Sequence, residues 1–597
     1  MLSASQNILI LTSDGDALGA ALSANTGTVL RHAQLGHVVF HLGKDAGFPD
    51  LSTFDVILIC TANLLDLPTE GARAIVDFVA KGGGLGVLYR SIHKELNALF
   101  GISPPQERVA YVGTAHAENG LHFPGRAFPA FAGLTLGETY MVGHASLDVW
   151  ALRDVEIIAT TLTGKPIVWR NKFGAGWVIY WNTGFLSEKF ARGLIIETLQ
   201  CLRPIAVLPL VNASVLQVDD FPAPLSDDLH GTVAAEFPDL TGSQFYCTIW
   251  YPDLIGVAAK AAMPISLFCT FDYTNRTTPP FVPWRDTPLV AGLGDPSRDT
   301  FEAARALPPD EMGLHGFNHL SLVSDAWPDQ ATMQTSLEAA QTAWVEMGLG
   351  PLPTAYVPPN NEYDETGAGA LHAACPTLRV ISGNYIGAPN ARGGNREFAP
   401  EPWQPTLFCL PRATAGYECS QRTLFDAASQ IAAFGIWTHF LHADDVCDTP
   451  EHSAVKGVPR NPRNLAWRGR IGTPGLLKEL ARLLDTVQRR FPWLRGMTTT
   501  AAADRLAAFL ETPWTVCVQG TRLRIAGAHG SHFQVRLNGS PRPRIRKCEG
   551  ARILHRTSAT DYCMYVIVQD AGEVKIEISH RTRAGDLKNR LRRLVST

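Results

Sequence analysis

The chain has 597 residues, of which 46% are hydrophobic and 18% are charged, and its net charge at pH 7 is −4. This composition is typical of a globular chain with about three or four domains, and the weak charge argues against nucleic acid or an anionic membrane as a partner. No apolar stretch approaches the ~20 residues of a membrane helix, and the 11 cysteines form no C-x-x-C pair, which argues against a zinc ribbon or a dense disulfide framework.

The start of the chain, MLSASQNILILTSDGD, does not have the pattern of a signal peptide. It lacks a basic first segment, and its apolar run is short and ends in Asp14. We therefore expect either a cytoplasmic protein or a mature chain whose signal has been removed.

Residues 1–205 alternate β-rich runs with helical patterns. Short apolar runs occur at 7–12, 37–42, 56–60 and 85–89. Between the last two, Ala72, Ile75, Val76 and Val79 form one apolar helical face. Two hairpin-like strands follow at 166–170 and 177–182. Strand–helix alternation predicts a parallel, doubly wound sheet.

This first segment resembles the flavodoxin-like domain of class I glutamine amidotransferases. Active members of that class carry a Cys nucleophile in a sharp turn directly after a strand. Here Tyr89 or Arg90 stands at that position, and Cys60 follows a different strand without flanking glycines. We expect a non-catalytic scaffold or a glycan-docking module.

Residues 206–510 contain seven strand-like runs with helical stretches among them. The runs are 214–220, 264–271, 312–317, 354–359, 378–383, 406–412 and 435–442. Such a segment predicts a closed or nearly closed parallel barrel of (β/α)7 type. Reactive side chains of parallel barrels gather at the carboxyl ends of the strands, where most polar motifs of this segment lie.

Residues 511–597 change character to short alternating strands separated by Gly and Asn turns. This pattern predicts a small all-β domain, a β-sandwich. The fold prediction is thus an α/β multidomain chain with three domains, at 1–205, 206–510 and 511–597.

Three clusters of polar residues carry the candidate chemistry. Asp219 and Asp220 end the strand 214–220, where two adjacent like charges call for a metal or a basic partner. His315 and His319 have the i, i+4 spacing that places both imidazoles on one face of a helical turn. Taken singly, these clusters are also compatible with a solvated turn and with unrelated loop histidines.

The third cluster closes the strand 435–442 and contains His439 and His442. Side chains at these two positions of a strand point to opposite faces, so at most one of them enters the barrel mouth. The spacing alone leaves open which of the two does.

The order of these clusters resembles the NodB-homology polysaccharide deacetylases, a group like carbohydrate esterase family 4. The resemblance implies that Asp219 is the general base and His442 the general acid, with His439 as the alternative. It also implies that Asp220, His315 and His319 hold one divalent metal, Zn²⁺ in the first place and Co²⁺ or Ni²⁺ as alternatives.

Two departures from the family pattern mark a divergent branch. The first motif reads Gln-Val-Asp-Asp-Phe instead of Thr-Phe-Asp-Asp-Gly. The family motif Arg-x-Pro-x-Gly, which shapes the substrate groove, corresponds here to residues 356–364 and lacks its Arg. We assign the missing positive charge by position to Arg412, after the strand 406–412. The substrate-binding residues expected from this motif are Tyr356, Pro359, Asn360, Asn361 and Asp364.

The divergent branch includes the deacetylase part of Pel exopolysaccharide modification proteins and fungal galactosaminogalactan deacetylases. It implies an acetylated polysaccharide or oligosaccharide as partner, with N-acetylgalactosamine as a constituent, and a periplasmic or extracellular place of action. The function expected is metal-dependent N-deacetylation. The alternatives are an O-deacetylase or amidase, and a catalytically silent glycan-binding protein.

Overall fold

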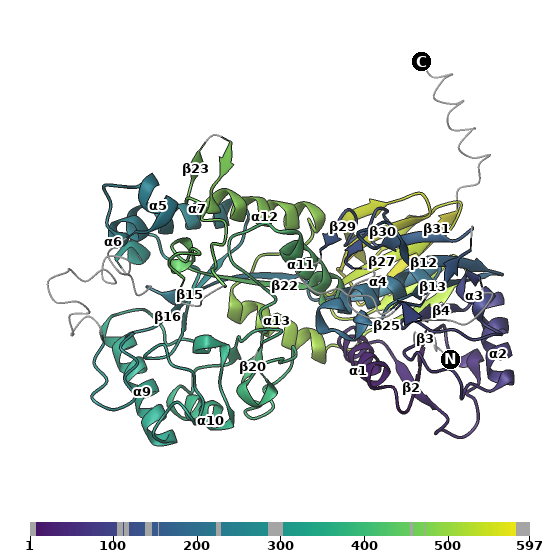
Figure 1. The fold of residues 1–597 in the computed structure, drawn as a ribbon, viewed down its shortest axis with the longest axis horizontal. Helices are drawn as coiled ribbons and strands as arrows, with labels where there is room; N and C mark the ends of the chain where they lie inside the picture. Colours follow the sequence, from purple (N-terminus) through teal and green to yellow (C-terminus); the bar gives the residue numbers. More distant parts are fainter. Residues whose placement is uncertain are drawn as a thin grey trace, which may run out of the picture. The chain divides into compact units, whose positions relative to one another are not determined.

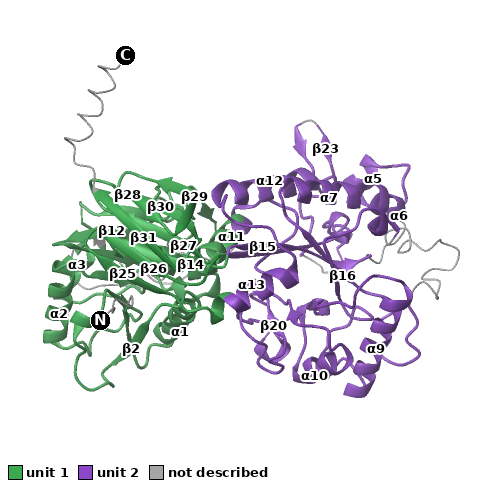
Figure 2. Cartoon of the chain, turned by 180° about the vertical axis from the view of Figure 1, so that it is seen from behind, with its two compact units in different colours: residues 1–211, 424–435, 509–597 green, residues 212–423, 436–508 purple. Residues whose placement is uncertain are grey.

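The computed structural model describes residues 7–103, 111–112, 119–137, 146–147, 149–152, 154–222, 229–283, 302–387, 389–453, 458–470 and 472–580 (Figure 1). The chain divides into two compact units (Figure 2). Unit 1 comprises residues 1–211, 424–435 and 509–597, and unit 2 comprises residues 212–423 and 436–508. Among the described helices, none combines the length and the apolar character needed to cross a membrane.

Unit 1 contains a nine-stranded mixed sheet with the order β2-β1-β3-β4-β13-β12-β11-β7-β8. The first five strands are parallel, as the strand–helix alternation predicts, and the others are antiparallel. The strands are β1 Ile8–Ser13, β2 His37–Leu42, β3 Val56–Ile59, β4 Gly84–Val87, β7 Leu121–His122, β8 Thr135–Leu136, β11 Glu156–Thr160, β12 Pro166–Phe173 and β13 Gly176–Trp181.

One helix of unit 1 has a side-chain cap at its start. Helix α1 (Ala17–His32) starts at Asp16, whose carboxylate accepts the N–H of Gly19 at 2.9 Å and so satisfies one free backbone donor of the first turn. The other helices are α2 (Thr69–Ala80), α3 (Asn97–Phe100) and α4 (Arg192–Leu202).

The strands β25 to β31 near the end of the chain also belong to unit 1, and together with β14 they form two four-stranded antiparallel sheets. One has the order β14-β27-β30-β29 and the other β25-β26-β31-β28. Their inner residues, including Val207, Leu523, Phe533 and Ile576, make one hydrophobic core. The strands are β14 Ile205–Leu210, β25 Thr515–Gln519, β26 Arg522–Ala526, β27 His532–Asn538, β28 Pro543–Glu549, β29 Ala551–Ser558, β30 Tyr562–Gln569 and β31 Glu573–His580.

Unit 2 is built on a curled, wholly parallel sheet with the order β20-β19-β18-β17-β16-β15-β22-β21. It is half a barrel, because among the described residues its edge strands β20 and β21 do not pair with each other. All seven predicted strand segments are present, and β21 is an eighth. The strands are β15 Ala213–Phe221, β16 Ile265–Cys269, β17 Glu311–Leu314, β18 Ala355–Tyr356, β19 Val380–Ile381, β20 Phe408–Cys409, β21 Thr414–Ala415 and β22 Ile436–His442.

Helices flank this sheet in Figures 1 and 2. The longer ones are α7 Tyr251–Lys260, α9 Gln330–Glu346, α10 Glu365–Ala374, α12 Leu476–Arg490 and α13 Thr499–Glu511. Helix α11 (Gln421–Phe434) belongs to unit 1 from residue 424 onward. The shorter elements of unit 2 are α5 Gly231–Glu236, α6 Gly242–Phe245, β23 Gly469–Arg470 and β24 Thr473–Pro474. Every residue of β15 is buried, as expected for a strand in the middle of a covered parallel sheet.

The interior of the curled sheet leaves no room for a side chain at Gly313 in β17. A Cβ there would lie 2.4 Å from the Phe268 ring and 2.9 Å from the carbonyl oxygen of Ala355. Because Phe268 is fully buried, we expect Gly313→Ala to lower the free energy of unfolding by roughly 1–3 kcal/mol. Calorimetric Tm measurements check this.

Gly256→Ala is the matched control, because a Cβ at this exposed position of α7 meets no atom within 4 Å. This substitution should leave Tm unchanged or raise it, since alanine favours a helix by about 0.5–1 kcal/mol. Equal losses of Tm in both variants would contradict the packing described for β17.

Candidate metal centre

Five of the predicted site residues lie at the carboxyl ends of three parallel strands. Asp219 and Asp220 close β15, His315 and His319 follow β17, and His442 closes β22. Asp219 and His442 are register partners on adjacent strands. The parallel topology therefore brings segments that are far apart in the sequence to one edge of the sheet.

The backbone at Asp220 separates two carboxylates that are neighbours in sequence. Asp220 has a φ of 55°, in the left-handed region that residues with a side chain seldom adopt. The register of β15 with β16 shifts between Val218 and Phe221. As a result, Asp219 and Asp220 contact different sets of partners.

Asp220, His315 and His319 form a compact triad. Oδ1 of Asp220 lies 2.9 Å from Nε2 of His315 and 3.1 Å from Nε2 of His319. One ligand atom from each residue lies within 4.8 Å of the other two. Two imidazole nitrogens and one carboxylate oxygen are a ligand set for Zn²⁺ and similar divalent ions, and three protein ligands leave a position open.

The surroundings orient the triad and favour positive charge within it. The carbonyl oxygen of Val357 lies 2.7 Å from Nδ1 of His315, which leaves Nε2 to face the carboxylate of Asp220. Burial raises the pKa of the Asp220 carboxyl, but its contacts with His315 and His319 lower that pKa well below the usual range. A divalent cation would meet the same demand for positive charge, so these residues fit a metal.

Asp219 is held on one side only. Arg412 donates from Nη1 to Oδ2 of Asp219 and from Nη2 to Oδ1 of Asn361. Oδ1 of Asp219 is buried and has no hydrogen-bond partner among the described residues. Arg412 thus supplies a positive charge beside the carboxylate, at the place assigned to it from the sequence.

His442 faces the same carboxylate and has its own acidic partner. Its Nε2 lies 3.7 Å from Oδ2 of Asp219, and its Nδ1 lies 3.2 Å from Oδ1 of Asp445. Burial lowers the pKa of His442, but the carboxylates of Asp445, Asp220 and Asp219 raise it to about 10. The imidazole is therefore arranged to carry a proton toward the site.

His439, the alternative acid, is a core residue. It is fully buried, with Nδ1 2.8 Å from the hydroxyl of Thr414 and Nε2 2.8 Å from the carbonyl oxygen of Gly416. Burial lowers its pKa to about 4. Both ring nitrogens are occupied away from the carboxylates.

The predicted substrate-binding loop follows β18. Asn360 and Asn361 both have left-handed backbone angles, with φ of 56° and 58°. Asn361 accepts from Arg412, and Asn360 donates from Nδ2 to the hydroxyl of Ser321 at 3.1 Å. Asn361 is thereby joined through Arg412 to Asp219.

The other three predicted substrate residues have different environments. Tyr356 is fully buried, and its hydroxyl has no hydrogen-bond partner within the described part of the chain. Pro359 is buried in the turn that follows. Asp364 caps α10 by accepting the N–H of Gly367 at 2.9 Å, and it also accepts the N–H of Ser324 at 2.6 Å. Substrate contact by these residues stays a prediction.

Three residues join the site without having been assigned to it from sequence. Asp445 holds His442, and Arg460 lies 2.9 Å from Asp445. The hydroxyl of Tyr273 donates to the backbone oxygen of Asp220 at 3.1 Å, and its ring stacks on His319. The i, i+3 spacing from His442 is a signal for Asp445, whereas no sequence pattern points to Arg460 or Tyr273.

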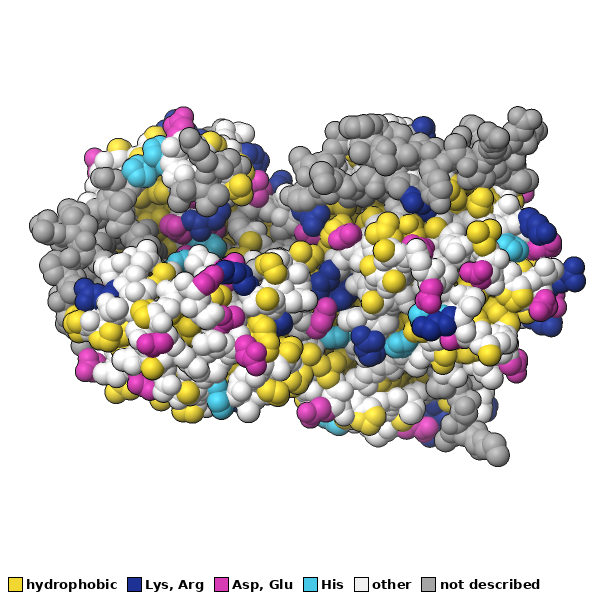
Figure 3. Space-filling view, turned by 60° about the horizontal axis from the view of Figure 1, so that its bottom comes forward, with side chains coloured by type: hydrophobic (Ala, Val, Ile, Leu, Met, Phe, Trp, Pro, Cys, Tyr) yellow, Lys and Arg dark blue, Asp and Glu magenta, His cyan; other side chains and the backbone are white. Residues whose placement is uncertain are grey.

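The described surface over unit 2 is hollowed where charged side chains gather. Figure 3 shows histidine, acidic and basic side chains together at such a hollow. The side chains of His319 and His442 are 28% and 18% exposed, so solvent reaches the triad and the acid candidate.

Comparisons with known proteins give one family match. The model of a family described as "Uncharacterised protein conserved in bacteria (DUF2194)" matches residues 139–563. A comparison with curated protein sequences gives no match.

Several solved structures are similar over part of the chain. β-Galactosidase from Bacillus circulans sp. alkalophilus shares 16% identity over 35% of this chain and 34% of its own, with a TM-score of 0.25. Exo-β-1,4-mannosidase Op5Man5 from Opitutaceae bacterium strain TAV5 shares 12% identity over 32% of this chain and 34% of its own, with a TM-score of 0.23. Endo-glycoceramidase II from Rhodococcus sp. shares 10% identity over 62% of this chain and 89% of its own, with a TM-score of 0.17. The chain thus spans 34% of the length of each of the first two enzymes.

The triad geometry predicts one divalent ion per chain. We expect His315→Ala and His319→Ala each to weaken metal binding by roughly tenfold or more, since each removes one of three ligands. Metal analysis by mass spectrometry after dialysis measures this. His372→Ala in α10, an exposed histidine, should keep full metal content. Unchanged content in both triad variants would rule out the site.

Proposed function

The chain belongs to the DUF2194 family of proteins conserved in bacteria, and we propose that it is a metal-dependent polysaccharide deacetylase. The bond broken is the acetamide bond of N-acetylhexosamine units, with N-acetylgalactosamine as the favoured sugar. Zn²⁺ is the proposed metal. The resemblance of the unit 2 motifs to NodB-homology deacetylases supports this proposal.

The same proposal extends to the fold. We assign the curled parallel sheet of unit 2 to a deacetylase barrel of (β/α)7 type. The mixed sheet of unit 1 is assigned to the flavodoxin-like class and the C-terminal strands to a β-sandwich. The strand orders support these assignments.

One observation carries the functional proposal: a carboxylate and an imidazole lie beside a possible metal triad, and each is held in place by a partner of its own. Asp219 and His442 both belong to strands that end at the triad. Hydrolysis of an amide needs a base for the attacking water and an acid for the leaving nitrogen. The site offers one candidate for each task.

The chain's own residues divide the work. When bound, a divalent ion supplies Lewis acidity toward the acetamide carbonyl and the attacking water. Oδ1 of Asp219 accepts the proton of the water, while Arg412 keeps Oδ2 in place. Nε2 of His442 donates a proton to the departing nitrogen, and Asp445 holds the opposite ring nitrogen. Acetate and a free amine are the products.

A product assay tests the proposal directly. The full chain is incubated with N-acetylgalactosamine and N-acetylglucosamine oligomers in the presence of Zn²⁺, Co²⁺, Ni²⁺ or a chelator. We expect acetate and free amine in equal amounts, and neither with the chelator. Acetate without amine would indicate an ester substrate, and the absence of both would reject deacetylation.

Asp219→Asn should lower kcat by roughly 10²–10⁴-fold, because an amide cannot accept the proton of the attacking water. Metal content should stay at the level of the unmodified chain, since Asp219 is not part of the triad. Acetate release and metal analysis on the same preparation measure both quantities. A variant with near-normal kcat would show that the base is another residue.

The two histidines of β22 should differ in their effects. His442→Ala is expected to lower kcat by roughly 10²–10⁴-fold, because it removes the proton donor. Its Tm should stay within a few degrees of that of the unmodified chain. His439→Gln should lower Tm, since two buried hydrogen bonds are disturbed, and leave kcat per folded molecule within a few-fold. The reverse pattern in kcat and Tm would assign the acid to His439.

A further inference from the structure

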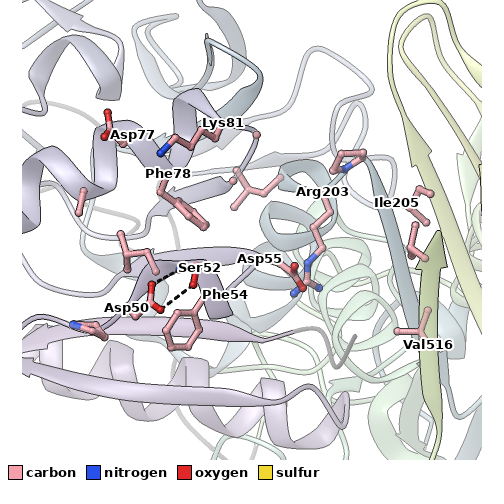
Figure 4. Close-up of a pocket in the computed structure, with 18 of the residues that line it drawn as sticks. Asp50, Ser52, Phe54, Asp55, Asp77, Phe78, Lys81, Arg203, Ile205 and Val516 are labelled. Atoms are coloured by element: carbon pink, nitrogen blue, oxygen red, sulfur yellow. Dashed lines mark hydrogen bonds between the residues drawn. The ribbon is translucent and has the colours of Figure 1, made fainter. Parts of the chain in front are cut away.

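A cavity of about 830 Å³ lies in unit 1 at the amino ends of the parallel strands β3 and β4 (Figure 4). We call it the basal groove and define it by Phe54, Phe78, Lys81, Arg203, Ile205 and Val516. Its volume is within the range of about 300–1,000 Å³ typical of ligand sites. The metal triad belongs to unit 2 and contributes nothing to it.

Two phenylalanine rings give the basal groove an aromatic wall. Phe78 near the end of α2 and Phe54 before β3 are both half-buried, and both line the cavity. The ring of Phe78 lies against Gly83, where a Cβ would come within 2.3 Å of its Cε1 atom. A glycine at this position therefore lets the ring lie where it does.

Charged groups of both signs surround these rings. Arg203 is 5% exposed, and Asp55 acts on its guanidinium through charge; Figure 4 shows the two side chains close together. Lys81 and Asp77 are exposed on the other side. Asp50 accepts the N–H and the hydroxyl of Ser52 at 3.0 and 2.9 Å.

The charges favour a neutral ligand that is rich in hydroxyl groups. Three carboxylates, those of Asp50, Asp55 and Asp77, would repel an anion, and two cations would oppose a positively charged ligand. A wholly apolar ligand would strip water from these charged groups without replacing its hydrogen bonds. A hydroxyl group both donates and accepts hydrogen bonds, so it can pair with the cationic and with the anionic side chains.

We propose that the basal groove binds uncharged pyranose units of the acetylated polysaccharide as a non-catalytic glycan site. An apolar C–H face of a sugar ring packs on Phe54 and Phe78, and the hydroxyl rim meets Lys81, Arg203 and the carboxylates. The identity of the sugar rests on the proposed function. The groove would keep a polymer attached to the enzyme between turnovers.

Binding is measured on the full chain that carries Asp219→Asn, so that the probe is not consumed. The probes are hexamers of N-acetylgalactosamine and of N-acetylglucosamine, followed by calorimetry and by hydrogen exchange. We expect slower exchange in segments 49–55 and 74–83 with at least one hexamer. Phe78→Ala should abolish this protection and weaken that binding at least tenfold, while kcat on a short oligomer in the otherwise unmodified chain stays the same.

Two further variants distinguish loss of the groove from a general change in the core of unit 1. Gly83→Ala should displace the Phe78 ring. It should therefore reproduce the loss of exchange protection and of hexamer affinity without removing an aromatic side chain. Phe173→Ala, a partly buried ring of the same core outside the groove, should bind like the parent. Unchanged protection and affinity in both the Phe78 and Gly83 variants, or no protection with either hexamer, would overturn the proposal.

The failure of this proposal is distinguishable from failure of the proposed function. Deacetylation without protection of the groove segments overturns the glycan site alone. Protection of those segments without any deacetylation supports the glycan site and rejects the activity.

Discussion

The site depends on how two adjacent carboxylates at the end of β15 are stabilised. Asp219 and Asp220 would repel each other if both faced one space without cations. The left-handed backbone at Asp220 separates them, so that Arg412 compensates one carboxylate and two imidazoles compensate the other. This separation places one carboxylate in the possible metal triad and leaves the other with an oxygen that has no hydrogen-bond partner among the described residues.

The parallel sheet of unit 2 lets few residues build this site. Each of its strands ends at the same edge, so one or two residues per strand suffice to assemble the site. The partners that hold these residues come from the loops that follow, as Val357 does for His315 and Asp445 for His442. Rigid strands fix the side-chain positions, and the loops adjust their orientation and protonation.

Unit 1 has a different chemical character from unit 2. Its Cys60 is fully buried after β3, and burial raises the pKa of the thiol to about 12, so the thiol stays protonated at neutral pH. Its large cavity lies at the amino ends of the strands, opposite the edge where open parallel sheets usually hold their ligands.

The sequence by itself determined the strand segments of unit 2, because apolar runs are local features. It also pointed to the three members of the triad, but the helical turn expected from the i, i+4 spacing was wrong: His315 and His319 lie in an irregular segment in which Gly316 has a φ of 90°. It left open whether His439 or His442 faces the site, and it could place Arg412 only by position. The tertiary structure decided these points, since the orientation of a strand and the contacts of a buried arginine depend on neighbours far away in the chain. Arg460 and Tyr273 had no local signal at all, because their roles arise only from the partners that the folded sheet brings to them.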